Sequence, residues 1–139
     1  MPAKPPPPNL DSFHKERSKL MDGFALVEAR LVQAIARKGG LAKGGTLATR
    51  IKSLREQGAT QHSAELEACF DRLQNLNALR TDLVHGTLGL IDHDGERFAI
   101  FSNARDAAKP VQSASRLTYK TIQAISRELT KCEAHIEAA

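Results

Sequence analysis

Residues 76–101, LNALRTDLVHGTLGLIDHDGERFAIF, contain the point at which the sequence changes its hydrophobic period. In the first part, apolar residues recur at the three- and four-residue spacing of an amphipathic helix. Gly86 ends this pattern, and two short β-rich runs follow on either side of Asp94-Gly95. Because Asp-Gly favours the positive φ angles of a two-residue hairpin turn, the sequence predicts a β-hairpin over residues 87–101.

Helical patterns lie on both sides of this hairpin. Four helices are predicted, with approximate bounds 10–38, 46–58, 63–85 and 113–137, and a loop is expected over 102–112. Short connections between helices favour antiparallel neighbours. The fold class that we expect is therefore all-α, an antiparallel four-helix bundle with a small β-hairpin inserted before the last helix. Pro-rich residues 1–9 read as a disordered tail, followed by a single domain over 10–139.

One face of each long predicted helix is apolar and indicates the core. In the first helix this stripe consists of Phe13, Leu20, Phe24, Val27, Leu31 and Ile35. In the third it consists of Leu66, Cys69, Phe70, Leu73, Leu76, Leu83 and Val84, and in the last of Thr118, Ile122, Ile125, Leu129, Cys132 and Ile136. The two cysteines are interpreted as core residues, since neither belongs to a Cys-x-x-Cys pair.

Composition excludes several classes of protein. The chain has 139 residues, of which 41% are hydrophobic and 26% charged, which is enough to bury a core. No apolar run approaches the roughly 20 residues that span a bilayer, and the amino end lacks the apolar stretch of a secretory signal. Two cysteines provide neither a disulfide framework nor a zinc quartet. We therefore expect a cytoplasmic protein with no membrane segment.

The basic residues are unevenly distributed. Residues 1–60 contain eleven Lys or Arg and five Asp or Glu, a net charge of +6, whereas residues 61–139 have a net charge of −2. Between Ala29 and Arg55 there are seven cations and no acid. Such a block suits the phosphate backbone of RNA or another polyanion. The alternative is a solvated helix face whose acidic partners come from elsewhere in the fold or from a second subunit.

Two polar residues interrupt the apolar side of the third predicted helix. At about 100° per residue, Asn77 and Arg80 lie within about 40° of the apolar stripe. Since an unpaired buried guanidinium is costly, Arg80 requires a carboxylate, a cleft, a second subunit or an anion. His85 is about 140° from Arg80 around the helix and stands at its end, where the side chain can reach a groove.

The stretch from Leu79 to Gly86, an Arg-x4-His pattern followed by Gly at the end of a helix, resembles the signature of HEPN domains (higher eukaryotes and prokaryotes nucleotide-binding). The resemblance implies a helical bundle of about this length. Many members are metal-independent endoribonucleases that act as homodimers, in which the two Arg/His pairs meet across the interface. They often occur as toxins or anti-phage effectors beside a cognate antitoxin.

The resemblance implies catalytic roles for Arg80 and His85. Attack of a 2′-hydroxyl on the adjacent phosphate needs a base, an acid and positive charge, which an imidazole and a guanidinium provide without a metal or other cofactor. Asn77 and Thr81 would orient the scissile phosphate. The family commonly has Asn, Asp or His after the arginine. Thr81 keeps a hydroxyl there but cannot shuttle a proton as Asp or His can.

A Gly-rich stretch, residues 39–46, precedes the second predicted helix. It lacks the Gly-Lys-Ser/Thr of a nucleotide-hydrolase phosphate loop, and no strand precedes it. Free amides at the start of the helix, with Lys43 and Arg50 nearby, could still hold a backbone phosphate. The alternative is a connector between helices.

A structural role for the motif remains open. Arg80 could form an ion pair with Glu28, which lies on the inward stripe of the first helix, and His85 could stabilise the helix end as a cation. The chain would then be a non-catalytic module that forms dimers and binds a protein partner or nucleic acid. Asp92 and Asp94 flank His93, but turn geometry explains Asp94, so we predict no metal site there.

Overall fold

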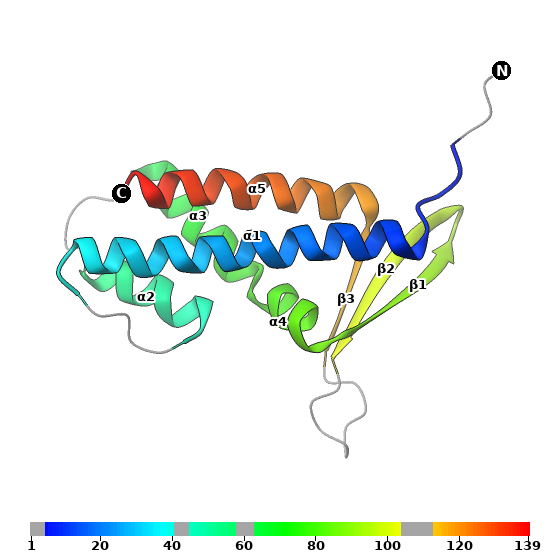
Figure 1. The fold of residues 1–139 in the computed structure, drawn as a ribbon, viewed down its shortest axis with the longest axis horizontal. Helices are drawn as coiled ribbons and strands as arrows, with labels where there is room; N and C mark the ends of the chain where they lie inside the picture. The colour runs from blue at the N-terminus through cyan, green and yellow to red at the C-terminus, as the bar shows by residue number, and fades with distance from the viewer. Residues whose placement is uncertain (1–4, 41–44, 58–62, 104–112) are drawn as a thin grey trace, which may run out of the picture.

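Five helices and a three-stranded antiparallel sheet make up the described part of the chain in this computed structural model, residues 5–40, 45–57, 63–103 and 113–139 (Figure 1). The helices are α1 (Leu10–Arg37), α2 (Leu47–Gln57), α3 (Ala64–Asn75), α4 (Asn77–His85) and α5 (Tyr119–Glu137). The strands are β1 (Thr87–His93), β2 (Glu96–Asn103) and β3 (Ser113–Thr118). The predicted all-α class is therefore wrong, and the fold is a mixed α and β structure.

The longest helix, α1, begins and ends where its capping residues predict. Asn9 Oδ1 accepts a hydrogen bond of 2.9 Å from the backbone N–H of Ser12. At the other end Gly39 has φ +79°, and the N–H groups of Gly39 and Gly40 donate to the carbonyls of Ala36 and Ile35. These two bonds form a Schellman motif, which needs a residue in the left-handed region.

The helices pack together as a bundle in which α1 and α5 run side by side in the same direction (Figure 1). Arg30 Nε on α1 lies 2.7 Å from Glu133 Oε1 on α5, and the Phe13 and Tyr119 rings pack edge to face near the opposite end. The expected antiparallel bundle is thus wrong for this pair. A parallel pair is possible because the chain crosses back through α2, α3, α4 and the sheet before α5 begins.

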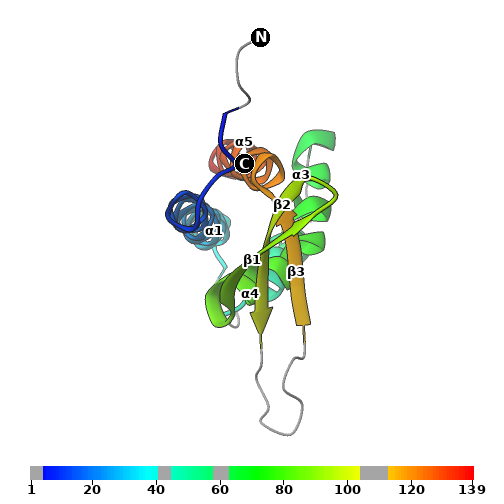
Figure 2. The same cartoon turned by 90° about the vertical axis from the view of Figure 1, so that its right-hand side faces the viewer.

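The sheet lies at one end of the helical bundle, with strand order β1-β2-β3 (Figure 2). The predicted hairpin is confirmed, since β1 pairs with β2 and both turn residues, Asp94 and Gly95, have positive φ angles of 51° and 76°. Ala99 and Phe101 of β2 are buried against the helices. The alternation of buried and half-buried residues from Phe98 to Ser102 is that of a sheet with one face packed against the core.

The last helix is predicted to begin at residue 113, but α5 begins only at Tyr119. Residues 113–118 form β3, which pairs with β2 in the register Phe98↔Thr118 and Phe101↔Ser115. Thr118 is not a core residue of a helix but the N-cap of α5, since its Oγ1 accepts from the N–H of Thr121 at 3.2 Å. Of the predicted loop over 102–112, residues 104–112 lie outside the described residues.

The third predicted helix is broken in two. Leu76, with φ −86° and ψ −3°, ends α3 and starts α4, so a single helical wheel does not describe residues 63–85. The core positions before the break are buried apart from the half-buried Cys69, whereas Val84 is 43% exposed and its predicted core role is wrong. The predicted core stripe of α1 is buried throughout.

Residues 5–8 lie beside the sheet and the start of α5. Arg97 Nη1 on β2 donates a hydrogen bond of 3.0 Å to the carbonyl of Pro8, and Tyr119 lines the same hollow. None of the described helices has the length and apolar character needed to cross a membrane.

Candidate functional site

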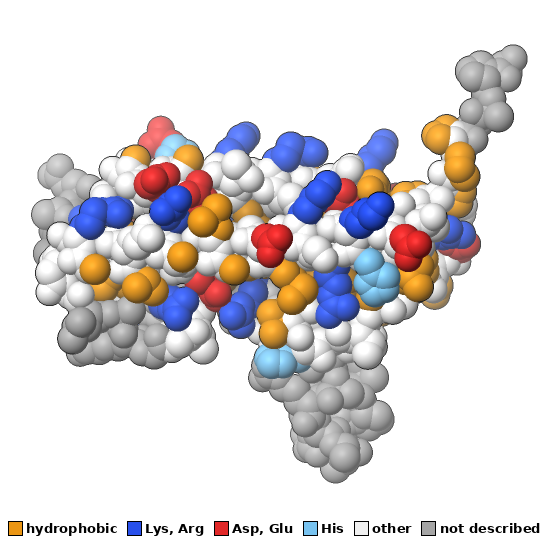
Figure 3. All heavy atoms as spheres, in the orientation of Figure 1, with side chains coloured by type: hydrophobic (Ala, Val, Ile, Leu, Met, Phe, Trp, Pro, Cys, Tyr) orange, Lys and Arg blue, Asp and Glu red, His pale blue; other side chains and the backbone are white. Residues whose placement is uncertain are grey.

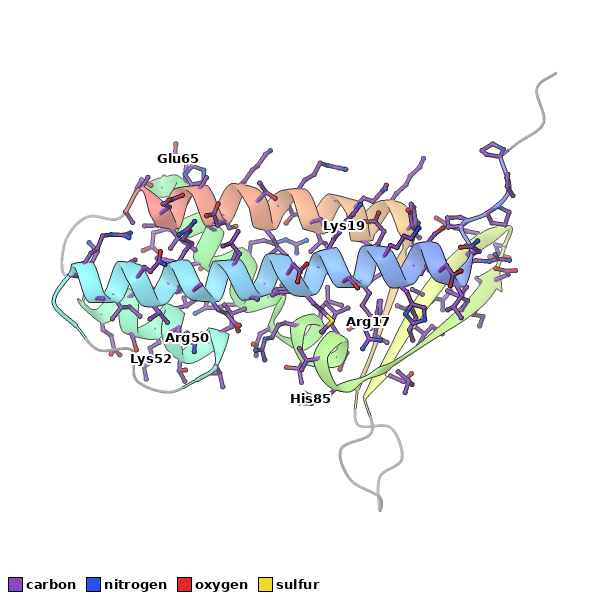
Figure 4. All side chains as sticks on the ribbon, in the orientation of Figure 1. Arg17, Lys19, Arg50, Lys52, Glu65 and His85 are labelled. Atoms are coloured by element: carbon purple, nitrogen blue, oxygen red, sulfur yellow. The ribbon has the colours of Figure 1, made fainter. Side chains whose placement is uncertain are left out.

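The helix that carries the Arg-x4-His pattern, α4, is held at its carboxyl end by a guanidinium from α1. Arg17 Nη2 donates to the carbonyls of Leu83 at 2.5 Å and Gly86 at 2.9 Å, and the guanidinium lies over the Phe101 ring. A cation at this position satisfies free carbonyls and interacts favourably with the helix dipole. The end of α4, and His85 with it, is therefore fixed relative to α1 (Figure 4).

The sheet fixes α4 from its other side. Asp82 is 1% exposed, and its Oδ2 accepts a hydrogen bond of 2.7 Å from Ser115 Oγ on β3. At Gly86 the chain turns directly from α4 into β1. A Cβ atom at this position would collide with the carbonyl oxygen of Asp82 and lie 2.8 Å from that of Ser102. Only glycine fits this junction, which explains the Gly that follows the histidine.

Arg80 reaches from α4 to α1, where it meets Glu28. Nη2 of Arg80 lies 3.0 Å from Oε1 of Glu28, and the two side chains are 24% and 12% exposed. The atoms are close, but their geometry is not that of a hydrogen bond, because Glu28 Oε1 is buried without a hydrogen-bond partner. The contact is therefore an ion pair, and Arg80 donates no side-chain hydrogen bond to any residue that the structure describes.

His85 is exposed at the last position of α4 (Figure 4). Among the described residues it has no hydrogen-bond or ion-pair partner. Its place is about 140° around the helix from Arg80 and about 7.5 Å further along the axis. The two side chains of one molecule therefore point toward different edges of α4, and they do not converge on a single atom.

The other predicted binding residues occupy different places. Asn77 and Thr81 are half-buried on α4, and Thr81 Oγ1 donates to the Asn77 carbonyl at 3.0 Å. The Thr81 hydroxyl is thus used within the helix, as is common for Ser and Thr in helices. Arg50 lies on α2, on the same side of α1 as His85 (Figure 4), and its Nε is buried without a partner in the described structure. Lys43 lies outside the described residues.

Apolar side chains surround the Arg80–Glu28 pair on this face. Met21 and Val32 of α1 and Val84 of α4 are exposed, and a cavity of about 170 Å³ between the two helices has Met21, Glu28, Arg80 and Val84 in its wall. Figure 3 shows basic and acidic side chains interspersed on the face turned to the viewer, with apolar groups and imidazoles between them. We call the surface formed by Met21, Ala25, Val32, Arg80 and Val84 the α1–α4 face.

The helical wheel found Glu28 as a partner for Arg80 but missed Arg17. Nothing in the local pattern around Arg17 marks it, because its acceptors are backbone carbonyls some seventy positions further along the chain. In the described parts of the chain, no three His, Cys, Asp or Glu side chains come together as a metal site.

Comparisons of the sequence with protein-family models, with curated proteins and with solved structures give no match.

Proposed function

We propose that the protein is a HEPN-type endoribonuclease that cleaves single-stranded RNA without a metal ion and acts as a homodimer. One observation carries the proposal. Arg80 and His85, the two residues of the Arg-x4-His pattern, both keep their hydrogen-bonding groups unused by the described residues, although they lie on a helix anchored from two sides. A guanidinium and an imidazole on a fixed support are the groups that phosphodiester cleavage requires.

In the proposed reaction the 2′-hydroxyl of a nucleotide attacks its own 3′-phosphate. His85 moves protons to or from the reacting oxygens, and Arg80 donates two N–H groups to the phosphate oxygens as negative charge develops. The products are a 2′,3′-cyclic phosphate and a free 5′-hydroxyl. Because Glu28 holds Arg80 by charge without a hydrogen bond, the N–H groups of Arg80 remain available to the phosphate.

A second copy completes the site in this proposal. One chain offers a single motif histidine, and the roles of acid and base are met most simply by two. The α1–α4 face has an apolar surface around Arg80 and His85 nearby, so a twofold contact there would bring two pairs together. In the cell such an enzyme would act as a toxin or defence component restrained by a cognate antitoxin.

A second candidate function is a non-catalytic module that forms dimers and binds a protein partner or nucleic acid. It is favoured by two contacts. Arg80 has an internal counter-ion in Glu28, and the Thr81 hydroxyl is engaged by the Asn77 carbonyl. In this function the same face would bind without cutting.

The test is cleavage of a fluorescent single-stranded RNA in EDTA by the wild-type chain, by His85→Ala and by His93→Ala. His93 is the matched control, an exposed histidine on β1 away from α4. Since loss of a general acid or base costs 10²–10⁴-fold in rate, His85→Ala should cleave at least about 100-fold more slowly. His93→Ala should cleave at the wild-type rate, and the product should end in a cyclic phosphate.

Wild-type protein that leaves varied RNAs intact under these conditions would reject the nuclease. Equal cleavage by the wild type and His85→Ala would reject it as well, because the activity would then come from elsewhere. Binding of RNA without cleavage would favour the second candidate function.

A further inference from the structure

A pair of thiols lies between two helices, α3 and α5. Cys69 of α3 and Cys132 of α5 line one cavity of about 210 Å³, together with Arg72 and Glu128 of the same two helices. Both cysteines are free in the structure. We propose that Cys69 and Cys132 form an intramolecular disulfide when the chain meets hydrogen peroxide, which makes the pair a reversible oxidation site.

An ion pair sets the register that brings the thiols together. Arg72, one turn after Cys69, lies with Nε 2.5 Å and Nη2 3.3 Å from the carboxylate oxygens of Glu128, one turn before Cys132. Such a two-point contact, between side chains that are 44% and 39% exposed, favours one register of α3 against α5. The thiols are neighbours because of this antiparallel packing, although they are far apart in the sequence.

The two thiols differ in their surroundings, and this difference assigns their roles. Cys69 is half-buried at the cavity, whereas Cys132 is buried in the core. Burial, followed by the neighbouring Cys69 thiol, raises the pKa of the Cys132 thiol to about 12. The more accessible Cys69 is therefore the thiol that the oxidant reaches first, since reaction requires thiolate and access.

The chemistry takes two balanced steps. The Cys69 thiolate attacks hydrogen peroxide, so that an S–O bond forms, the O–O bond breaks and hydroxide leaves, which yields a sulfenic acid. The Cys132 sulfur then attacks the sulfenic sulfur, the new S–S bond replaces the S–O bond, and the Cys132 proton leaves with the departing oxygen as water. Overall, one hydrogen peroxide molecule is reduced to two water molecules, and the two thiols together lose two electrons as they form the disulfide.

The disulfide would tie α3 to α5 and close the chain between residues 69 and 132. A cross-link of this kind restricts the unfolded chain more than the folded one, so the oxidised protein should unfold at a higher temperature. Cys69 and Cys132 are on different helices from Arg80 and His85, so the site does not depend on the proposed nuclease activity.

The test uses the full chain, reduced and then treated with hydrogen peroxide. After denaturation and treatment with N-ethylmaleimide, the monomer should carry no label and weigh about 2 Da less than the reduced chain. Dithiothreitol should restore two labelled thiols. Unreacted thiols, disulfides only between separate chains, or a sulfinic acid at Cys69 beside a free Cys132 would each overturn the proposal.

Variants test the assigned roles. Cys132→Ala should accumulate a sulfenic acid at Cys69 that dimedone traps, whereas the wild type should give little of that adduct. Glu128→Gln should form the disulfide several-fold more slowly, while Glu133→Gln, which breaks an ion pair from the same helix to α1, should react at the wild-type rate. Equal dimedone trapping in the wild type would overturn the resolving role of Cys132, and equal rates in the two glutamate variants would overturn alignment by Arg72.

Discussion

At the level of single side chains, two ion pairs of α1 invite comparison. Arg80–Glu28 and Arg30–Glu133 are similarly exposed, with side-chain values of 24% and 12% for the first and 27% and 15% for the second. Arg30 Nε donates a hydrogen bond to Glu133 at 2.7 Å, and this bond raises the pKa of Arg30. The Arg80 pair lacks such a bond. A comparison of the two pairs therefore distinguishes the energetic effect of nearby opposite charges from that of a hydrogen bond.

We expect the coupling free energy of Arg80 and Glu28 to be about 1 kcal/mol or less, because the contact lacks a hydrogen bond and the Arg80 side chain remains partly exposed. Double-mutant cycles with Arg80→Gln and Glu28→Gln, measured by urea unfolding, give this value. The matched cycle with Arg30→Gln and Glu133→Gln should give the larger coupling, because a hydrogen bond is lost as well. A larger coupling for Arg80 and Glu28 would identify Arg80 as a structural residue and favour the non-catalytic module.

Sequence patterns located the Arg80–Glu28 neighbours but not the nature of their contact. The wheel positions of both residues follow from helical periodicity, which is local information. Whether an N–H points at the oxygen depends on how α1 and α4 pack, and this is set by residues far along the chain, among them Arg17 and Ser115. The bond from the Thr81 hydroxyl to the Asn77 carbonyl is, by contrast, local to α4 and of a kind common in helices, so helical geometry alone allows it to be predicted.

At the level of elements, the hairpin has its own electrostatic stabilisation. Arg97 binds Asp92 through two bonds, Nε to Oδ1 at 2.7 Å and Nη2 to Oδ2 at 3.0 Å. The hydrogen bonds from Arg97 hold the pKa of the Asp92 carboxyl below its ordinary value. The contact joins two strands across the turn, since Asp92 and Arg97 are paired in the β1–β2 register.

Because the folded pKa of Asp92 is lowered, its stabilising contribution is present above the ordinary pKa of Asp and is lost as the pH falls through the lowered value. We expect Arg97→Ala to return the pKa of Asp92 to its ordinary range and to remove this dependence. Carboxyl chemical shifts of Asp92 measured against pH test this. Arg116→Ala, on β3, is the control, and a shifted Asp92 pKa in that variant alone would contradict the assignment.

Elements with strong local signals were predictable, and those that depend on distant partners were not. Asn9 and Gly39 bound α1, and Asp94-Gly95 marks the hairpin, so short stretches suffice for both. β3 is a six-residue polar stretch, SASRLT, whose strand conformation depends on pairing with β2. The break at Leu76 is not marked by a Gly or Pro residue, and the helical spacing of apolar residues continues on both sides of it.

At the level of the whole molecule, the parallel course of α1 and α5 has no signal in the sequence. Connection length favours antiparallel neighbours, but here the partners are the first and last helices, which meet after the chain has crossed the sheet. In this arrangement α5 covers one side of α1, and the α1–α4 face on the other side remains exposed. The proposed dimer follows from that uncovered face.

The dimer can be tested by Val84→Asp and Ile91→Asp. Both side chains are 43% exposed, but Val84 belongs to the α1–α4 face and Ile91 to β1. We expect the wild type and Ile91→Asp to sediment at twice the chain mass of 15.2 kDa. Val84→Asp should sediment as a monomer, because burial of an unpaired carboxylate opposes the contact.

A monomeric wild type would reject the twofold site, and a monomer from Ile91→Asp with an intact Val84→Asp dimer would move the interface to the sheet. Loss of RNA cleavage in the Val84→Asp monomer, with its fold intact by circular dichroism, would connect assembly with activity.

The junction at Gly86 separates two kinds of constraint on neighbouring positions. Residue 86 is limited by space, since any side chain would strike the backbone of Asp82 and Ser102. A descendant of this chain that had lost all chemistry would still need glycine there to pass from helix to strand. Its neighbour His85 is exposed and has no partner among the described residues, so the packing of the fold does not require a histidine there. In a set of related chains, conservation of the glycine would therefore indicate a shared fold, whereas conservation of the histidine would indicate selection for a reactive imidazole.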